Sequence, residues 1–154
     1  MPLAPQETRT FFITSVTQGR RAVLQSSKMA QLLMHVLQEN RTKGRFLLHE
    51  FVIMPDHFHV LITPAEDVSL EKAVQYVKGG FSFRAKRELG FNGEVWQESF
   101  ANHRIKDAED YGRHRNYIRQ NPVSRFLAEK PELYPYSSPY AGADIDPAPP
   151  WLKP

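Results

Sequence analysis

The sequence of 154 residues contains no cysteine. This absence excludes disulfide bonds, thiolate metal ligands and a cysteine nucleophile, and it fits a reducing compartment. The sequence also lacks the run of roughly 18 apolar residues that spans a bilayer. Its first residues, MPLAPQETRT, have no apolar core of the kind that signal peptides carry. We therefore expect a cytoplasmic protein that does not associate with membranes.

The side chains that are present suffice for one packed domain, since 41% of the residues are hydrophobic and 24% are charged. Charge is distributed unevenly along the chain. Residues 1–125 carry 18 basic and 13 acidic side chains, a net charge of +5, whereas residues 126–154 carry 2 basic and 4 acidic ones, a net charge of −2. A basic body favours a phosphate-rich partner, although ordinary solubility explains the charge equally well.

Proline is concentrated at the end of the chain. From residue 144 the sequence reads DIDPAPPWLKP, and its four prolines in eleven residues exclude a helix or a central strand. We therefore divide the chain into a domain at residues 1–143 and a proline-rich tail at residues 144–154, which we expect to be extended or loosely docked.

Periodicity and turn signals predict alternating strands and helices in the domain. The expected strands lie at 9–17, 45–54, 57–63 and within 96–106, and the expected helices lie at 26–43, 69–89 and 107–120. The first six elements follow the split βαβ order of ferredoxin-like folds, an α+β class with a four-stranded antiparallel sheet and helices on one face. The last helix, which should end or bend at Pro122, follows this unit.

The most informative stretch reads FVIMPDHFHVLITP. His57 and His59 are two positions apart in an expected strand, so both imidazoles project from one face, roughly 6.6 Å apart along the chain. Two neutral imidazoles on one face can ligate the same metal ion. Their other ring nitrogens then need partners, for which Asp56, Glu50 and His49 are candidates.

A partly exposed histidine pair on a strand is the simpler interpretation. A metal site is favoured because the pair follows a Pro-Asp turn and is anchored by the apolar segment VLI. Two histidines are an incomplete ligand set for a divalent ion, so a third ligand has to come from another element. An amide oxygen would favour Mg²⁺ or Mn²⁺, and a third nitrogen would suit Zn²⁺.

A second group of reactive side chains lies in YGRHRNYIRQNPV. Tyr117 and Asn121 are four positions apart, so a helix places the phenol and the amide on one face. The basic side chains around them, which include Arg113 and Arg119, favour the phenolate and a bound phosphate. Alternatively, Tyr117 packs the helix and Asn121 caps it. Tyr111 is a weaker candidate nucleophile because no amide or carboxylate follows it by four residues.

These two motifs carry a family resemblance. MPDHFHVLI is similar to the HUH motif (His, bulky apolar residue, His) of single-tyrosine HUH endonucleases. YIRQNPV, followed by LYPYSSPYAG, resembles the second motif and the C-terminal Ser-Ser segment of REP-associated tyrosine transposases, a branch of the insertion-sequence transposase superfamily. The resemblance covers roughly residues 9–141, and its specificity comes from two separated motifs in the right order and spacing.

The resemblance implies a ferredoxin-like fold, metal ligation by His57 and His59, and Tyr117 as the nucleophile. It implies Asn121 as the third, polar ligand, and Mg²⁺ or Mn²⁺ as the cofactor. The implied reaction is phosphoryl transfer on single-stranded DNA through a 5′-phosphotyrosine and a free 3′-hydroxyl. Bond energy is conserved in such a reaction, which fits the lack of a glycine-rich phosphate-binding loop.

DNA binding requires basic and stacking side chains. The segment KGGFSFRAKR, residues 78–87, has four basic residues, no acidic residue and two interleaved phenylalanines. We expect its basic side chains to contact the phosphates of a hairpin stem, although a solvated helix face explains the same pattern. The DNA-binding residues that we predict are Lys78, Arg84, Lys86, Arg87, Arg104, Arg113 and Arg119.

The resemblance further implies a partner, namely single-stranded DNA with palindromic hairpins, together with a bacterial, nucleoid-associated location and a monomer or homodimer. Three other functions stay open: a non-cleaving hairpin-binding module derived from a transposase, a metal-dependent hydrolase that uses water, and an RNA-binding domain of this fold. The last lacks the expected aromatic signature on its strands. A covalent protein–DNA adduct that is lost in Tyr117→Phe would single out the nuclease.

Overall fold

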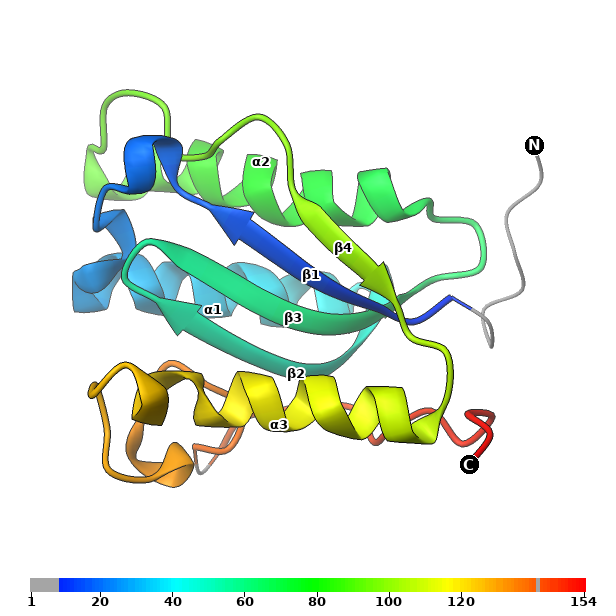
Figure 1. Ribbon diagram of the computed structural model, residues 1–154. Helices are drawn as coiled ribbons and strands as arrows, with labels where there is room; N and C mark the ends of the chain where they lie inside the picture. The colour runs from blue at the N-terminus through cyan, green and yellow to red at the C-terminus, as the bar shows by residue number, and fades with distance from the viewer. Residues whose placement is uncertain (1–8, 141) are drawn as a thin grey trace.

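Figure 1 shows the computed structural model of the chain, which describes residues 9–140 and 142–154. The strands and α-helices in these ranges are β1 (Phe11–Val16), α1 (Ser27–Thr42), β2 (Phe46–Met54), β3 (His57–Pro64), α2 (Leu70–Leu89), β4 (Ala101–Arg104) and α3 (Ala108–Ser124). Each of these helices begins after a side-chain cap, supplied by Ser26, Ser69 and Asp107 in turn, which accepts a backbone N–H bond.

The four strands form one antiparallel sheet in the order β2-β3-β1-β4. This is the strand order of a split βαβ unit, and it confirms the predicted ferredoxin-like α+β fold. The helices α1 and α2 cover one face of the sheet, and α3 lies against the other (Figure 1). The sheet is therefore sandwiched between two helical layers.

Two element boundaries differ from the prediction. The last strand is confined to β4, because Trp96 forms only an isolated bridge with Thr17. Helix α3 continues through Pro122 to Ser124. Proline removes one backbone hydrogen bond, to the carbonyl four residues before it, but here it lies in the last turn, where little of the helix follows.

The alternation of side chains along the strands creates two apolar cores. The larger core, between the sheet and the helices α1 and α2, contains Ile13 and Phe58. The smaller core, between the sheet and α3, contains Leu61 and Ile118. Because β3 side chains alternate, its two histidines lie on the same face as Leu61 and are directed toward α3.

The proline-rich tail is docked rather than loose. The backbone N–H of Asp146 donates to the Leu48 carbonyl at 2.7 Å, and its carboxylate accepts from the Leu48 N–H at 2.8 Å and from Arg41 at 3.1 Å. These bonds cover the outer edge of β2, which would otherwise offer unpaired backbone groups to another strand. In the described ranges no helix combines the length and hydropathy of a membrane span.

Candidate active site

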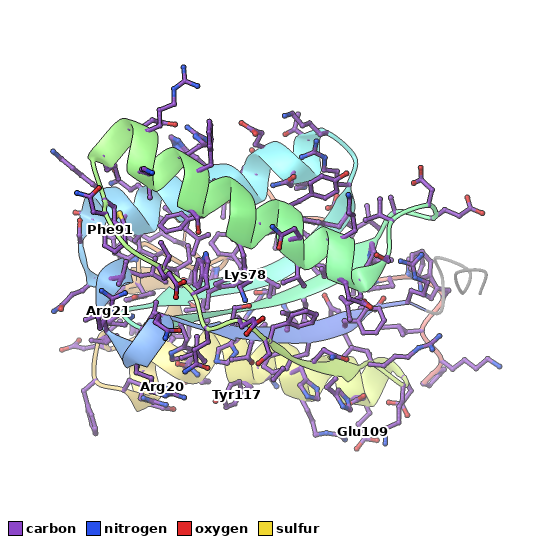
Figure 2. The ribbon with its side chains drawn as sticks, turned by 90° about the horizontal axis from the view of Figure 1, so that it is seen from above. Arg20, Arg21, Lys78, Phe91, Glu109 and Tyr117 are labelled. Carbon is purple, nitrogen blue, oxygen red and sulfur yellow. The ribbon has the colours of Figure 1, made fainter. Side chains whose placement is uncertain are left out.

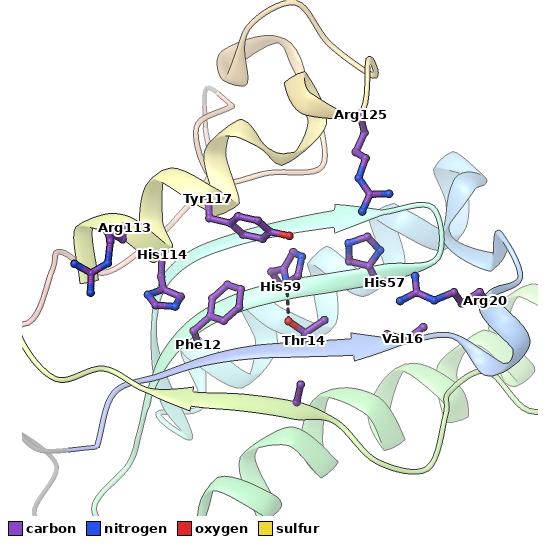
Figure 3. A pocket seen from close by; sticks show the side chains of 11 residues that line it. Phe12, Thr14, Val16, Arg20, His57, His59, Arg113, His114, Tyr117 and Arg125 are labelled. Carbon is purple, nitrogen blue, oxygen red and sulfur yellow. Dashed lines mark hydrogen bonds between the residues drawn. The ribbon is translucent and has the colours of Figure 1, made fainter. Parts of the chain in front are cut away.

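A cleft of about 550 Å³ opens on the α3 side of the sheet. Its floor comes from β1 and β3, and one wall comes from α3 (Figure 3). The predicted metal ligands His57 and His59 and the predicted nucleophile Tyr117 all line it. The other functional groups that line it are basic: Arg20, Arg113, His114 and Arg125. The fold thus brings together two motifs that are far apart in sequence and surrounds them with positive charge.

Hydrogen bonds fix both imidazoles through the same ring nitrogen. His57 Nδ1 lies 2.7 Å from Asp56 Oδ1, and His59 Nδ1 lies 2.8 Å from Thr14 Oγ1. In each ring Nε2 is left for another partner, which is the arrangement of metal-binding histidines whose second nitrogen is held by the protein. Asp56 was one of the three residues that the sequence suggested as partners of the histidine rings, and it is bonded to His57. Thr14 was not foreseen, because its pairing with His59 depends on the register of β1 against β3.

The other two candidates for the supporting role face elsewhere. His49 contacts the Thr63 hydroxyl and the Pro147 carbonyl. Glu50 is buried and accepts two hydrogen bonds from Arg119, at 3.0 and 3.2 Å, and one from the Ser138 hydroxyl at 2.6 Å. Neither residue therefore supports the histidine pair. Glu50 instead joins α3 and the segment around Ser138 to the sheet.

Both imidazoles are held in the neutral form. Burial, together with the smaller effects of the neighbouring His57 and Arg125, lowers the pKa of His59 to about 3. Burial also lowers the pKa of His57, against the opposing effect of Asp56. A neutral imidazole has a free lone pair, which a metal ligand requires.

Tyr117 projects from α3 over the histidine pair. Its ring meets the His59 ring edge to face at 5.3 Å between centroids, and the two imidazoles are 4.8 Å apart. In Figure 3 its hydroxyl is directed toward the imidazoles. The side chain is 51% exposed, so a substrate can reach it. Phe12 supports the ring from below, with centroids 5.9 Å apart.

Two predicted metal ligands have buried polar atoms without a hydrogen-bond partner. In the described part of the chain, four buried side-chain atoms lack a hydrogen-bond partner, and two of these are His59 Nε2 and Asn121 Oδ1. Unsatisfied buried polar atoms are costly and call for an explanation. A divalent cation bound by nitrogen and oxygen would satisfy both. Asn121 itself is 4% exposed, one turn beyond Tyr117, and does not line the cleft.

A second His/Asp cluster that could hold a metal lies beside the cleft. Donor atoms of His103, Asp110 and His114 are all within 4.8 Å of one another. Asp110 already accepts from His103 Nε2 at 2.7 Å and from the Lys106 backbone N–H at 2.9 Å. The two imidazoles are stacked, with centroids 4.5 Å apart and ring planes at 16°, so their in-plane lone pairs lie in two separate, nearly parallel planes, which is unfavourable for binding one ion.

The predicted DNA-binding residues are divided between the two faces of the molecule. Those on α2 lie across the sheet from the cleft, and in Figure 2 Lys78 lies between α2 and the sheet while Tyr117 lies on the α3 side. The side chains of Lys86 and Arg87 are exposed on α2, Arg104 is exposed on β4, and Arg113 is exposed at the cleft.

Four of these predicted residues already have partners within the protein, among them Arg113, which pairs with Glu109 at 3.1 Å and with Asp110 at 3.3 Å. Lys78 is buried and donates to the Gln97 and Ser99 carbonyls, because it closes the loop after α2. Arg119 pairs with buried Glu50, and Arg84 pairs with Glu88 at 2.6 Å. The sequence did not reveal these partners, since charge pattern alone does not say which cations are engaged within the protein.

Comparison with known proteins identifies the family. The family model described as "Transposase IS200 like" matches residues 8–121. This chain belongs to that family. In this IS200-like transposase the matched range contains both cleft histidines, Tyr117 and Asn121.

Individual relatives agree with this assignment. The REP-associated tyrosine transposase of Escherichia coli K12 is 26% identical over 130 residues, which cover 84% of this chain and 75% of that protein. A Haemophilus influenzae protein named "Putative REP-associated tyrosine transposase" is 32% identical over 96 residues, which cover 56% of this chain and 54% of that protein. A solved REP-associated tyrosine transposase bound to a REP hairpin shares the fold, with a TM-score of 0.71 and 24% identity, over 90% of this chain and 81% of the other.

Proposed function

We propose that this IS200-like transposase is a metal-dependent endonuclease and strand transferase for single-stranded DNA, with Tyr117 as its nucleophile. One observation supports this most strongly: a solvent-accessible phenol on α3 faces two neutral imidazoles on β3 across one basic cleft (Figure 3). A substrate phosphate in this cleft would meet the phenol, the imidazoles and several cations together.

The proposed ligands are His57 Nε2, His59 Nε2 and Asn121 Oδ1, a set of two nitrogens and one oxygen. Mg²⁺ or Mn²⁺ at these atoms would polarise the phosphate oxygens and stabilise the phenolate. Asp56 and Thr14 hold the two rings in place, so that the two Nε2 atoms need little reorganisation.

Tyr117 is the residue that forms the covalent bond to DNA in this proposal. Its oxygen attacks the phosphorus of a phosphodiester, a bond forms between them, and the bond from phosphorus to the 3′ oxygen breaks. The phenol gives up its proton, and the departing 3′ oxygen takes one up. The products are a 5′-phosphotyrosine and a free 3′-hydroxyl. Attack by another 3′-hydroxyl on the phosphotyrosine then restores the phenol, so no nucleotide cofactor is consumed.

We infer that the substrate is single-stranded DNA that carries a palindromic hairpin. The solved relative of this fold is bound to a REP hairpin. The cleft cations would hold the single strand, and the exposed Lys86 and Arg87 on α2, together with Arg104, would contact the stem. The protein would act as a monomer or homodimer in the bacterial cytoplasm, at the nucleoid.

A covalent-adduct assay tests the proposal. The probe is a labelled DNA hairpin with single-stranded flanks, selected for binding to this protein from a randomised hairpin library. We expect a denaturation-resistant protein–DNA adduct in Mn²⁺ or Mg²⁺, and none in EDTA or in the Tyr117→Phe variant. Tyr140→Phe is the matched control, because Tyr140 is comparably exposed but does not line the cleft.

Two outcomes would overturn the proposal. Tight binding with no adduct under any metal condition would indicate a hairpin-binding module. Cleavage that persists in Tyr117→Phe would indicate a hydrolase that uses water at the histidine pair.

A further inference from the structure

Two non-glycine residues with a positive φ belong to the segments that bring Arg20 and Arg125 to the cleft. Among the described residues, only Arg20 and Phe126 have a positive φ without being glycine, at 54° and 61°. Side chains with a Cβ atom adopt this conformation at a cost, and such positions are concentrated at functional sites. Arg20 lies before α1. Phe126 follows the C-cap of α3: its N–H donates to the Val123 carbonyl at 3.1 Å and the Leu127 N–H donates to the Pro122 carbonyl at 2.8 Å, so its positive φ is that of a helix C-terminal cap, a position that glycine usually occupies.

The arginines at this end surround a second hollow. A cavity of about 310 Å³ adjoins the cleft, and Arg20, Arg125 and His57 line both spaces. Figure 3 shows the two guanidinium groups directed toward His57 from different elements. Arg20 lies 3.3 Å from Asp56 Oδ2, whereas within the described ranges the side chain of Arg125 forms no hydrogen bond or ion pair. The end of the cleft therefore carries more positive charge than the protein itself balances.

An exposed aromatic residue follows Arg125 in sequence. Phe126 is 95% exposed, next in sequence to Arg125, and Leu127 lines the second hollow. Arg125 alone could be explained by the negative end of the α3 dipole. That explanation covers neither Arg20 nor the almost complete exposure of a phenylalanine at a cap position where glycine is usual. A groove lined by basic side chains, with an exposed aromatic residue next to it in the chain, is typical of surfaces for single-stranded nucleic acid.

We propose that Arg20, Arg125 and Phe126 form a subsite for the nucleotide next to the scissile phosphate. The two guanidinium groups bind its phosphate, and Phe126 stacks on its base. This inference rests on the proposed function, because it extends the same strand beyond the catalytic residues. It also gives the strand a direction of exit, from Tyr117 past His57 into the second hollow.

The phosphate contact can be tested by changing both the DNA phosphate and the arginine that would bind it. Binding is measured in Mn²⁺ with Tyr117→Phe as the background, using the selected hairpin with one neutral methylphosphonate moved stepwise along each flank. At one position the substitution should weaken binding roughly tenfold, which is typical of a lost charged hydrogen bond. In the same Tyr117→Phe background, Arg125→Ala should weaken binding to the unmodified probe by a similar factor. In this double variant the methylphosphonate at that position should no longer weaken binding. An unchanged methylphosphonate profile would contradict the contact.

The stacking contact has its own test. Phe126→Ala should weaken binding to the intact probe by roughly tenfold, but should have no effect on a probe that is abasic at the stacked nucleotide. Phe126→Gly separates stacking from strain, because glycine adopts a positive φ freely. It should bind as weakly as Phe126→Ala without lowering the melting temperature. Phe83→Ala, at an exposed phenylalanine on α2, is the matched control and should bind normally.

The outcomes distinguish this inference from the proposed function. If wild-type protein forms the Tyr117 adduct but Phe126→Ala binds intact and abasic probes as well as its parent does, the subsite is wrong and the nuclease stands. If no adduct forms but the methylphosphonate profile changes with Arg125→Ala, the subsite is supported and the protein is a DNA-binding module rather than a nuclease.

Discussion

At the scale of single residues, the site depends on which ring nitrogen each histidine keeps free. Thr14 holds His59 Nδ1 and Asp56 holds His57 Nδ1, both within 2.8 Å. Neither residue would touch the substrate in the mechanism that we propose. Their contribution is to fix ring orientation, so that two Nε2 atoms are available for one cation.

The role of Thr14 leads to the first prediction. Thr14→Val keeps the shape of the side chain but removes the hydroxyl, so the His59 ring loses its fixed orientation. We expect Mn²⁺ affinity to fall about 10- to 100-fold by isothermal titration calorimetry. Thr14→Ser, which keeps the hydroxyl, should bind nearly as wild type does. Equal affinities in Thr14→Val and wild type would show that the hydroxyl does not orient the ligand.

At the scale of elements, the placement of Tyr117 depends on how α3 is attached to the sheet. The Glu50 carboxylate is 2% exposed and is bonded to Arg119 and Ser138, which belong to different segments. A buried charge without its partner is unfavourable, so these bonds hold both segments against β2.

Arg119→Ala tests this attachment. Removing the guanidinium leaves Glu50 with weaker compensation from Arg115, which lies 3.8 Å away. We expect the free energy of unfolding to fall by about 2 kcal/mol in urea titrations, less than for a fully buried pair because Arg119 is partly exposed. Lys43→Ala, which breaks an exposed pair with Glu39, should cost under about 0.5 kcal/mol. Similar losses in both variants would count against an anchoring role.

The sequence predicted those features of the fold and site that depend on local periodicity. The shared face of His57 and His59 follows from strand alternation, and the element order follows from the apolar pattern. Contacts between distant residues could not be predicted in this way. Thr14 lies 45 positions from His59, and Glu50 lies 69 positions from Arg119. Such pairs depend on strand register and on which face of the sheet the last helix covers.

At the scale of the whole molecule, positive charge is present on two sides. The cleft carries arginines on the α3 face, and Lys86 and Arg87 are exposed on α2 across the sheet. In the function that we propose, the single strand occupies the cleft, on the opposite side of the sheet from α2. We therefore assign the α2 cations to a folded part of the DNA, namely the hairpin stem.

The double variant Lys86→Ala, Arg87→Ala tests this division. It should weaken binding to the hairpin probe and reduce its salt dependence by roughly 0.9 in slope for each lost duplex contact. Binding to the same flanks without a stem should not change. An unaltered salt slope on the hairpin would place the stem elsewhere on the surface.

Alkaline stability provides another test of the folded molecule. Burial raises the pKa of Tyr111 and of Tyr134 to about 12, from an ordinary value of 10.0. Between these values the unfolded chain has lost phenolic protons that the folded chain still binds, so stability should fall as pH rises. Thermal unfolding followed above about pH 10 should show this decline, and Tyr111→Phe should make it shallower. A melting temperature that does not change over this range would contradict the burial of the phenols.

The most direct test of the central claim is to locate the covalent bond on the protein. The adduct formed with the selected hairpin is digested with nuclease and protease, and the peptides are sequenced by tandem mass spectrometry. Our account predicts one modified peptide, with a nucleotide joined through its 5′ phosphate to Tyr117. A phosphate on any other side chain, or cleaved DNA without a modified peptide, would contradict it.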